Sequence, residues 1–91
     1  MSNELFVILG AGESGVGTAV LAKKKGYDVF VSDQGKIKQK YKDVLLHFDI
    51  AWEEEKHSVE KILKAVEVMK SPGIPDKSDI IKSLHEKGIP V

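Results

Sequence analysis

The sequence predicts an α/β fold, a Rossmann-like doubly wound parallel sheet of about five strands in three α/β/α layers. Two observations carry this prediction. Residues 5–9 are five consecutive apolar residues, the pattern of a parallel strand buried on both faces. A glycine-rich turn, a helical segment and a second apolar run at residues 29–32 follow. Strand, helix and strand within about 30 residues make one βαβ unit, which is almost always right-handed.

The first helix is expected over residues 14–25, where Gly26 is well suited to the position after a helix end. Its small residues Gly15, Ala19 and Ala22 suit close packing against the sheet. The second strand is closed by Asp33. Residues 36–47 are lysine-rich, and their apolar positions are spaced as in an amphipathic helix.

The second half of the chain continues the alternation of strands and helices. A short third strand is expected around residues 50–52, and Ser58 is a candidate N-cap for the next helix. That helix is expected to turn its apolar residues to one face: Val59, Ile62, Leu63 and Val66.

A fourth strand is expected over residues 67–70, although its charged ends fit a doubly buried strand poorly. Asp76 or Ser78 can cap a last helix that turns Ile80, Ile81 and Leu84 inward and stops at Gly88. Residues 89–91 then resemble the opening of a fifth strand.

The composition limits the classes of protein to which the chain can belong. The 91 residues are expected to form a single domain, 1–91, and there is no cysteine for disulfides or thiolate chemistry. The net charge is zero, which argues against a nucleic-acid partner. No apolar stretch approaches the length of a membrane span, so a cytoplasmic protein is expected. All 14 basic residues are lysines, so a bound phosphate must rely on backbone amides, hydroxyls and a helix dipole.

The loop Gly10-Ala11-Gly12-Glu13-Ser14-Gly15 matches G-x-G-x-x-G between a buried strand and a helix. Gly10 permits a tight turn, Gly12 lets a phosphate approach the backbone, and Gly15 lets the helix approach the strand. The amides of Glu13, Ser14 and Gly15, with the Ser14 hydroxyl, can then hold phosphate oxygens. The alternative is a purely structural glycine turn.

Two further segments are expected at the same carboxyl edge of the sheet, where ligands of doubly wound folds bind. Asp33 lies 23 positions after Gly10, where a carboxylate can accept a hydrogen bond from ribose hydroxyls or from a uracil N3–H. Asp33 as a helix N-cap is the alternative. The loop Ser71-Pro72-Gly73-Ile74-Pro75 suits contact with a bulky sugar, but a simple turn into the last helix explains it equally well.

No catalytic residue or metal site is predicted. His47, His57 and His85 lack metal-ligand spacing and are interpreted as scattered surface histidines. The run Glu53-Glu54-Glu55 is interpreted as a solvated acidic turn. No pair of nucleophile and base can be proposed.

The assembled motifs resemble the amino-terminal domain of the Mur ligase family, which makes peptidoglycan precursors, and in particular its D-glutamate-adding branch. The resemblance covers the whole chain and rests on four segments: Gly10 to Gly17, Val31-Ser32-Asp33, Ser71 to Pro75, and Gly88-Ile89-Pro90-Val91. Ser71 to Pro75 is the most discriminating of these, because the L-alanine-adding ligase typically differs there.

The resemblance implies that this domain, excised from a three-domain enzyme, binds the uridine diphosphate of UDP-MurNAc-L-alanine. Glu13, Ser14 and Gly15 would serve the diphosphate, Asp33 and Gln34 the uracil, and Ser71, Pro72 and Gly73 the sugar–diphosphate. Gly35 stands where some relatives have an arginine near the uracil, so that contact is missing here. ATP and magnesium would bind the central domain, D-glutamate would be bound with help from the last domain, and this domain would bind no cofactor and be inactive alone.

Two other classes of function compete with this interpretation. The glycine loop and Asp33 are equally compatible with an NAD(P)-binding module of an oxidoreductase or with a nucleotide-sensing domain. The loop at residues 71–75 and the lack of any residue placed for hydride chemistry speak against both. A pure interaction module would leave the glycine motif without a purpose.

Overall fold

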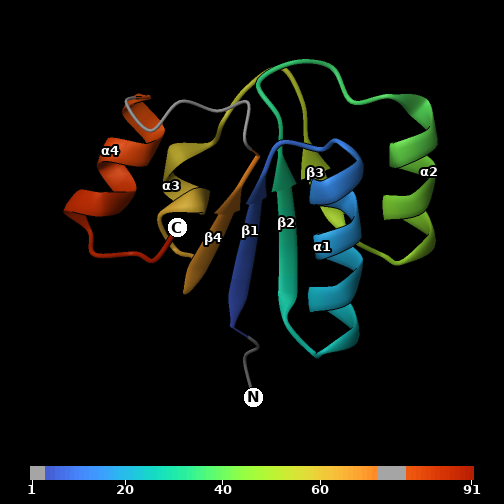
Figure 1. The fold of residues 1–91 in the computed structure, drawn as a ribbon, viewed down its shortest axis with the longest axis horizontal. Helices are drawn as coiled ribbons and strands as arrows, with labels where there is room; N and C mark the ends of the chain where they lie inside the picture. The colour runs from blue at the N-terminus through green and yellow to red at the C-terminus, as the bar shows by residue number, and fades with distance from the viewer. Residues whose placement is uncertain (1–3, 72–77) are drawn as a thin grey trace.

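The structure is a computed structural model that describes residues 4–71 and 78–91 (Figure 1). These residues form one parallel sheet of four strands, in the order β3-β2-β1-β4. The strands are β1 (Leu5–Leu9), β2 (Asp28–Ser32), β3 (Ala51–Glu53) and β4 (Glu67–Lys70). The helices are α1 (Glu13–Lys24), α2 (Gln39–His47), α3 (Val59–Ile62) and α4 (Asp79–Glu86). The predicted α/β architecture with a parallel sheet is confirmed.

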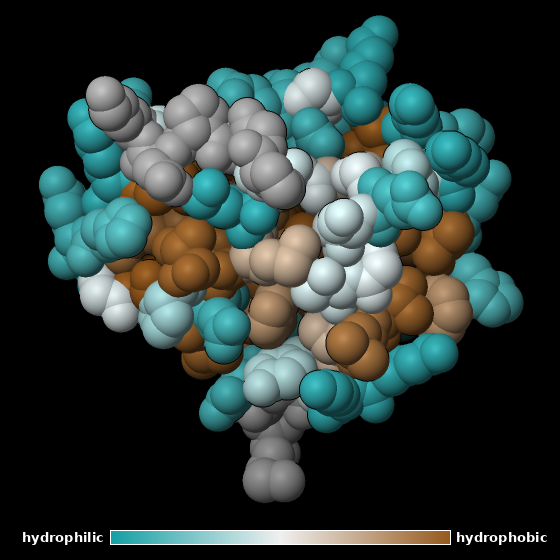
Figure 2. All heavy atoms as spheres, in the orientation of Figure 1, coloured by the Kyte–Doolittle hydropathy of each residue, from teal (hydrophilic) through white to brown (hydrophobic). Residues whose placement is uncertain are grey.

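The helices cover both faces of the sheet, as the doubly wound fold requires (Figure 1). On one face, β1 and β2 pack against α1 and α2 through a buried apolar cluster that includes Ile8, Val31 and Leu45. On the other face, Val7, Leu9 and Phe30 pack with side chains of α3 and α4. Successive residues of β1 therefore point to opposite cores, which is why the strand is apolar at every position. Figure 2 shows hydrophilic side chains around the outline of the molecule and hydrophobic ones between the layers.

All four strands run in one direction, so the segments that follow them gather at one edge of the sheet (Figure 1). The register is regular: Leu5 to Leu9 of β1 pair with Asp28 to Ser32 of β2. Ser32 and Glu53 are neighbours in the register of β2 and β3, and both lie at the carboxyl ends of their strands. This edge, which includes the glycine loop, is called the ligand edge below.

The second and third helices differ from the expectations at their ends. The second begins at Gln39 rather than near Lys36, because Ile37 is buried and its amide donates to a carboxylate oxygen of Glu54. α3 spans four residues, so Val59 and Val66 are 43% exposed and do not share an inward face with Ile62. Ser58 is its N-cap residue, but the Ser58 hydroxyl bonds to Glu53 instead of to a helix amide. The last helix has Ser78 at its N-cap position, but the Ser78 hydroxyl is buried and bonds to no helix amide or other described group. Ile80, Ile81 and Leu84 are buried as predicted, and Asp76 lies outside the described residues.

The predicted fourth strand has its expected bounds, and its position explains its charged ends. In the described sheet β4 is an edge strand, so only Val68 is fully enclosed and Glu67 is exposed. Residues 89–91 form no strand, yet the Pro90 carbonyl accepts a hydrogen bond from the Val68 amide at 2.9 Å. The end of the described chain therefore lies against β4.

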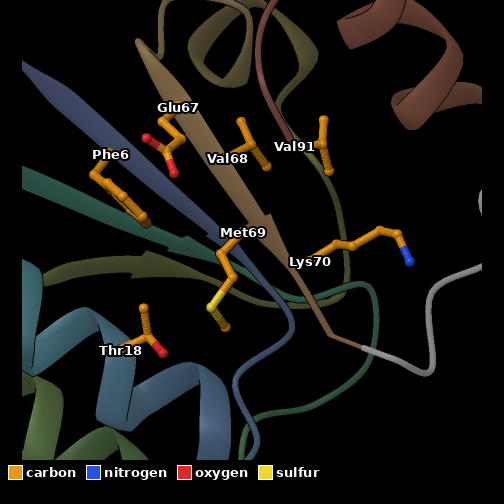
Figure 3. A pocket seen from close by; sticks show the side chains of 7 residues that line it. All are labelled: Phe6, Thr18, Glu67, Val68, Met69, Lys70 and Val91. Carbon is orange, nitrogen blue, oxygen red and sulfur yellow. The ribbon is translucent and has the colours of Figure 1, made fainter.

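A groove of about 700 Å³ follows β4 on the side of α1 (Figure 3). Its lining is mostly apolar and includes Phe6 from β1, Met69 from β4 and Val91. It runs along the strand rather than across the ligand edge. Among the described residues, no helix has the length and apolar composition needed to cross a membrane.

Candidate functional site

The glycine loop is held in place by two close approaches that require glycine. Gly10 has a φ of +104°, and its amide donates to the Ser32 carbonyl at 2.8 Å. A Cβ on Gly15 would stand 2.0 Å from the Gly10 carbonyl oxygen, so α1 starts in direct contact with the end of β1. The roles predicted for Gly10 and Gly15, a tight turn and a close approach of helix and strand, are confirmed.

The amino end of α1 is free to receive a ligand. Gly12 is the N-cap residue and supplies no side-chain acceptor, and a Cβ added there would meet no atom within 4 Å. Within the described part of the chain, the amides of Glu13, Ser14 and Gly15 donate no hydrogen bond, whereas the Val16 amide donates to the Gly12 carbonyl. The amides of exposed Glu13 and Ser14 and of buried Gly15 thus lie at the positive end of the helix dipole. This arrangement suits phosphate oxygens.

The segment after β4 reaches the glycine loop, as the sequence predicts. The Ser71 amide donates to the Leu9 carbonyl at 2.8 Å, and a Cβ on Gly10 would stand 2.6 Å from the Ser71 Cβ. The Ser71 side chain therefore lies directly over the start of the loop. Pro72 and Gly73, the other two residues predicted in this segment, lie outside the described residues.

Asp33 joins the second predicted segment to the first. One carboxylate oxygen accepts the Ala11 amide and the other accepts the Gly35 amide, each at 2.8 Å. Helix α2 begins only at Gln39, so the alternative of Asp33 as its N-cap is wrong. Asp33 is half-buried and Gln34 beside it is exposed, which leaves both at the surface of the ligand edge.

Behind Asp33 lies a polar network that sequence reasoning missed. The buried Ser32 hydroxyl lies 2.7 Å from a Glu53 carboxylate oxygen and 2.6 Å from His57 Nδ1. The other Glu53 oxygen accepts the Ser58 hydroxyl, and the Ser58 amide also donates to Glu53 at 2.6 Å. The interpretations of His57 as a scattered surface histidine and of Glu53 as part of a solvated turn are therefore wrong. The Ser32 hydroxyl joins residues 21–25 positions away, which the pairing of β2 with β3 brings close.

The surroundings shift the pKa values of both titratable groups in this network. Burial works against ionisation of Glu53, but hydrogen bonds from Ser58 and Ser32 and the charge of Lys56 outweigh it and lower the pKa of Glu53. Burial also lowers the pKa of His57, although the carboxylates of Glu53 and Asp33 act in the opposite direction. Near neutral pH the network therefore contains a carboxylate and a neutral imidazole.

The other two glutamates of the acidic run make separate contacts. Glu54 accepts hydrogen bonds from Lys42 Nζ at 2.7 Å and from the Ile37 amide at 2.9 Å, and these bonds lower the pKa of Glu54. Glu55 has a φ of +61° and is exposed, with Lys36 Nζ 4.0 Å away. Within residues 4–71 and 78–91, no three His, Asp or Glu side chains are grouped to hold a metal ion.

Ser32, His57 and Glu53 have the composition of a catalytic triad but not its accessibility. The Ser32 side chain is 0% exposed, so its oxygen cannot reach a substrate. Chemically, the start of α1 offers amide donors, and Asp33 is a neighbouring carboxylate acceptor.

The chain is similar to known proteins in sequence. The family model described as the MurD N-terminal domain matches residues 6–80. The UDP-N-acetylmuramoylalanine–D-glutamate ligase of Christiangramia forsetii is 68% identical over 86 residues, which are 94% of this chain and 19% of that protein. The ligases of the same name from Bacteroides fragilis and Cytophaga hutchinsonii are 59% and 51% identical, over 94% and 98% of the chain. The chain thus spans about a fifth of the length of these relatives.

The fold also matches a solved structure. The crystal structure of UDP-N-acetylmuramate:L-alanyl-gamma-D-glutamyl-meso-diaminopimelate ligase from Neisseria meningitides superposes with a TM-score of 0.79. The match covers 98% of this chain and 28% of that one, at 21% sequence identity. At this identity the likeness establishes the fold alone.

Proposed function

The chain belongs to the family of MurD N-terminal domains, and we propose that it holds the uridine diphosphate end of UDP-MurNAc-L-alanine for a larger ligase. The observation that carries this proposal is the trio of amides at Glu13, Ser14 and Gly15, which have no acceptor within the described residues. They follow closely after Ala11, whose amide donates to Asp33. These amides and the helix dipole would offer donors to a diphosphate.

The diphosphate would contact these amides and the Ser14 hydroxyl, with Gly12 leaving room for close approach. Because the chain has no arginine, amides supply the donors that a guanidinium supplies elsewhere. Glu13 is exposed, so its carboxylate can turn away from the phosphates into solvent.

The uracil would lie at Asp33 and Gln34, next to the diphosphate. Each Asp33 oxygen already accepts one backbone amide and keeps a lone pair that can accept the uracil N3–H or a ribose hydroxyl. Ser71, over the start of the glycine loop, would face the sugar–diphosphate, and Pro72 and Gly73 are proposed to continue that contact.

In the parent ligase this domain would anchor the substrate while other domains make the amide bond. The relatives are named as ligases, and this chain corresponds to about a fifth of each. We therefore assign ATP and magnesium to a central domain and D-glutamate to a site completed by the last domain. The chain by itself is expected to release no ADP from ATP in the presence of UDP-MurNAc-L-alanine and D-glutamate.

One titration tests the binding site. In ¹H–¹⁵N spectra, UDP is expected to shift the amides of Gly12, Ser14, Gly15 and Asp33, and Ser14→Ala is expected to weaken UDP about three- to tenfold. Ser83→Ala, on α4 away from the ligand edge, is the matched control and should bind as the unmodified chain does. Shifts with NAD and none with UDP would overturn the proposal in favour of a dinucleotide module.

A further inference from the structure

Ser32, like Asp33 itself, bonds to both loops that border Asp33. Its carbonyl accepts the Gly10 amide at 2.8 Å, which ties it to the glycine loop. Its hydroxyl lies within hydrogen-bonding distance of three groups at the end of β3 or beyond it: Glu53 Oε2 at 2.7 Å, the Lys56 carbonyl at 3.1 Å and His57 Nδ1 at 2.6 Å. The side chain is completely buried, so no solvent competes for these bonds.

Counting protons fixes the direction of the bonds. A serine hydroxyl has one proton to donate, whereas an ionised carboxylate and a carbonyl can only accept. Ser32 must therefore donate toward Glu53 or the Lys56 carbonyl. His57 Nδ1, only 2.6 Å from the same oxygen, must then donate to a Ser32 lone pair. The imidazole is the Nδ1–H tautomer, and its Nε2 carries no proton when the ring is neutral.

The same segment also holds the backbone of Asp33. The Asp33 amide donates to the Glu53 carbonyl at 3.1 Å, and the Lys56 amide donates to the Asp33 carbonyl at 3.3 Å. The Asp33 carboxylate in turn accepts the Ala11 amide within the glycine loop. A continuous chain of hydrogen bonds therefore runs from His57 through Ser32 and Glu53 to Asp33 and the loop.

We propose that His57, Ser32 and Glu53 are positioning residues for the ligand edge. In this proposal the Nδ1–H of His57 donates to the Ser32 hydroxyl oxygen and completes their hydrogen-bond network. They would fix Asp33 and the Ala11 amide in the positions a nucleotide needs, without touching the ligand. The identity of the ligand rests on the proposed function. The tautomer of His57 and the geometry of the unliganded loop do not depend on which ligand binds.

The electrostatics of the network fit this role. The pKa of Glu53 is lowered, which keeps an acceptor opposite the Ser32 hydroxyl. Burial lowers the pKa of His57 against the opposing charges of Glu53 and Asp33, which keeps the ring neutral. Lys56 is the charged group of opposite sign that acts on Glu53.

The first test identifies the protonated nitrogen of His57 in the unliganded chain. A long-range ¹H–¹⁵N spectrum at neutral pH is expected to show the proton on Nδ1. A proton on Nε2 would overturn the proposal, because Ser32 would then have to donate to His57 and leave Glu53 facing an oxygen without a proton.

The second test measures hydrogen exchange at the Ala11 amide, which donates a hydrogen bond to the Asp33 carboxylate. His57→Leu removes the donor and is expected to speed exchange about tenfold. His57→Asn places an amide donor near the position of Nδ1 and should restore protection to within about threefold. The same pair of changes at His85, an exposed residue of α4, is the matched control and should leave Ala11 unchanged. Unchanged protection in His57→Leu, or equal loss in both His57 variants, would refute a positioning role.

A UDP titration of the same variants connects the network to ligand binding. His57→Leu is expected to weaken UDP about tenfold, and His57→Asn to bind nearly as the unmodified chain does. If His57→Asn loses as much affinity as His57→Leu while protecting Ala11, the ring contacts the ligand and the positioning proposal is wrong. If the unmodified chain binds no UDP, the proposed function fails, and the tautomer and exchange results still decide the present proposal.

Discussion

The loop after β1 and the segment after β3 lie at the same edge of the sheet but are built in different ways. The glycine loop is shaped by the absence of side chains: Gly10 adopts a positive φ and Gly15 lies against the Gly10 carbonyl. The segment after β3 is shaped by charged and polar side chains, chiefly Glu53, Glu54 and His57. The first leaves three amides without a partner among the described residues. The second turns polar atoms inward, where they bond to Ser32 and Asp33 beside the first.

The two regions show which features of the edge can be predicted from neighbouring residues in the sequence and which can be seen only in the tertiary structure. A position with a positive φ or a close backbone contact requires glycine, so the loop can be recognised from the spacing of its glycines in the sequence. A hydrogen-bond network leaves no such spacing, because its members come from separate strands.

Gly15→Ala should have the largest effect on stability. The added Cβ would stand 2.0 Å from the Gly10 carbonyl oxygen, which is backbone and cannot move aside without separating α1 from β1. The expected loss in the free energy of unfolding is about 3 kcal/mol. Urea unfolding measures it. Gly17→Ala is the matched control in the same helix, because its Cβ would meet nothing within 4 Å, and it should gain about 0.5–1 kcal/mol. Similar losses in both variants would show that the approach of helix and strand is looser than described.

Asp33→Ala should have the next largest effect, because Asp33 bonds to both the glycine loop and the segment after β3. Its removal leaves the amides of Ala11 and Gly35 without their acceptor, at an expected cost of about 2 kcal/mol in unfolding free energy. UDP binding should be lost as well. Asp43→Ala is the control and should cost little, because Asp43 is exposed on α2 and its carboxylate accepts a hydrogen bond from the neighbouring Gln39 side chain. Full stability in Asp33→Ala would show that the glycine loop holds its shape alone.

The pH dependence of stability should identify the contribution of the β3 segment. The folded pKa of His57 lies below its unfolded value of about 6.5, so the unfolded chain binds a proton more readily. The His57 contribution is therefore complete above about pH 6.5 and is lost as the pH falls through the folded pKa. Glu53, with a lowered pKa, adds a loss at more acidic pH, below about 4.5.

Urea unfolding at pH 7.5, 6.5 and 5.5 separates these contributions. The free energy of unfolding should fall between pH 6.5 and 5.5, and His57→Asn should reduce that fall. His85→Asn should keep it. An unchanged pH profile in His57→Asn would mean that the imidazole is solvated in the folded chain.

The smallest effect should come from the ion pairs that flank the β3 segment. Lys42 Nζ lies 2.7 Å from Glu54 and its side chain is 24% exposed, whereas Lys36 Nζ lies 4.0 Å from Glu55 and is 82% exposed. Lys42→Met should lower the urea midpoint slightly and Lys36→Met should leave it unchanged, since exposed pairs contribute little. The small difference should shrink at high salt. A larger loss from Lys36→Met would contradict the contacts described here.

The parts of the fold that could be predicted are those that their own residues determine. The apolar run at 5–9 predicts β1, Gly26 marks the end of the first helix within a residue, and 67–70 gives β4 its bounds. The same holds for Gly10, Gly15 and Asp33, which the structure brings together. The short α3 was not predictable, because Val59 and Val66 have helical spacing but Val66 lies beyond the helix end. His57 and Glu53 were missed because their partner Ser32 belongs to another strand.

The bare amino end of α1 has a practical consequence for measurements on this chain. Because Gly12 contributes no acceptor, any anion that binds there preferentially in the folded state will stabilise it by mass action. The melting temperature should therefore depend on the buffer salt, and should rise in phosphate or sulfate relative to chloride at equal ionic strength. The stabilities of variants at the ligand edge are best compared in a buffer without polyvalent anions, so that anion binding at these amides does not change the measured values.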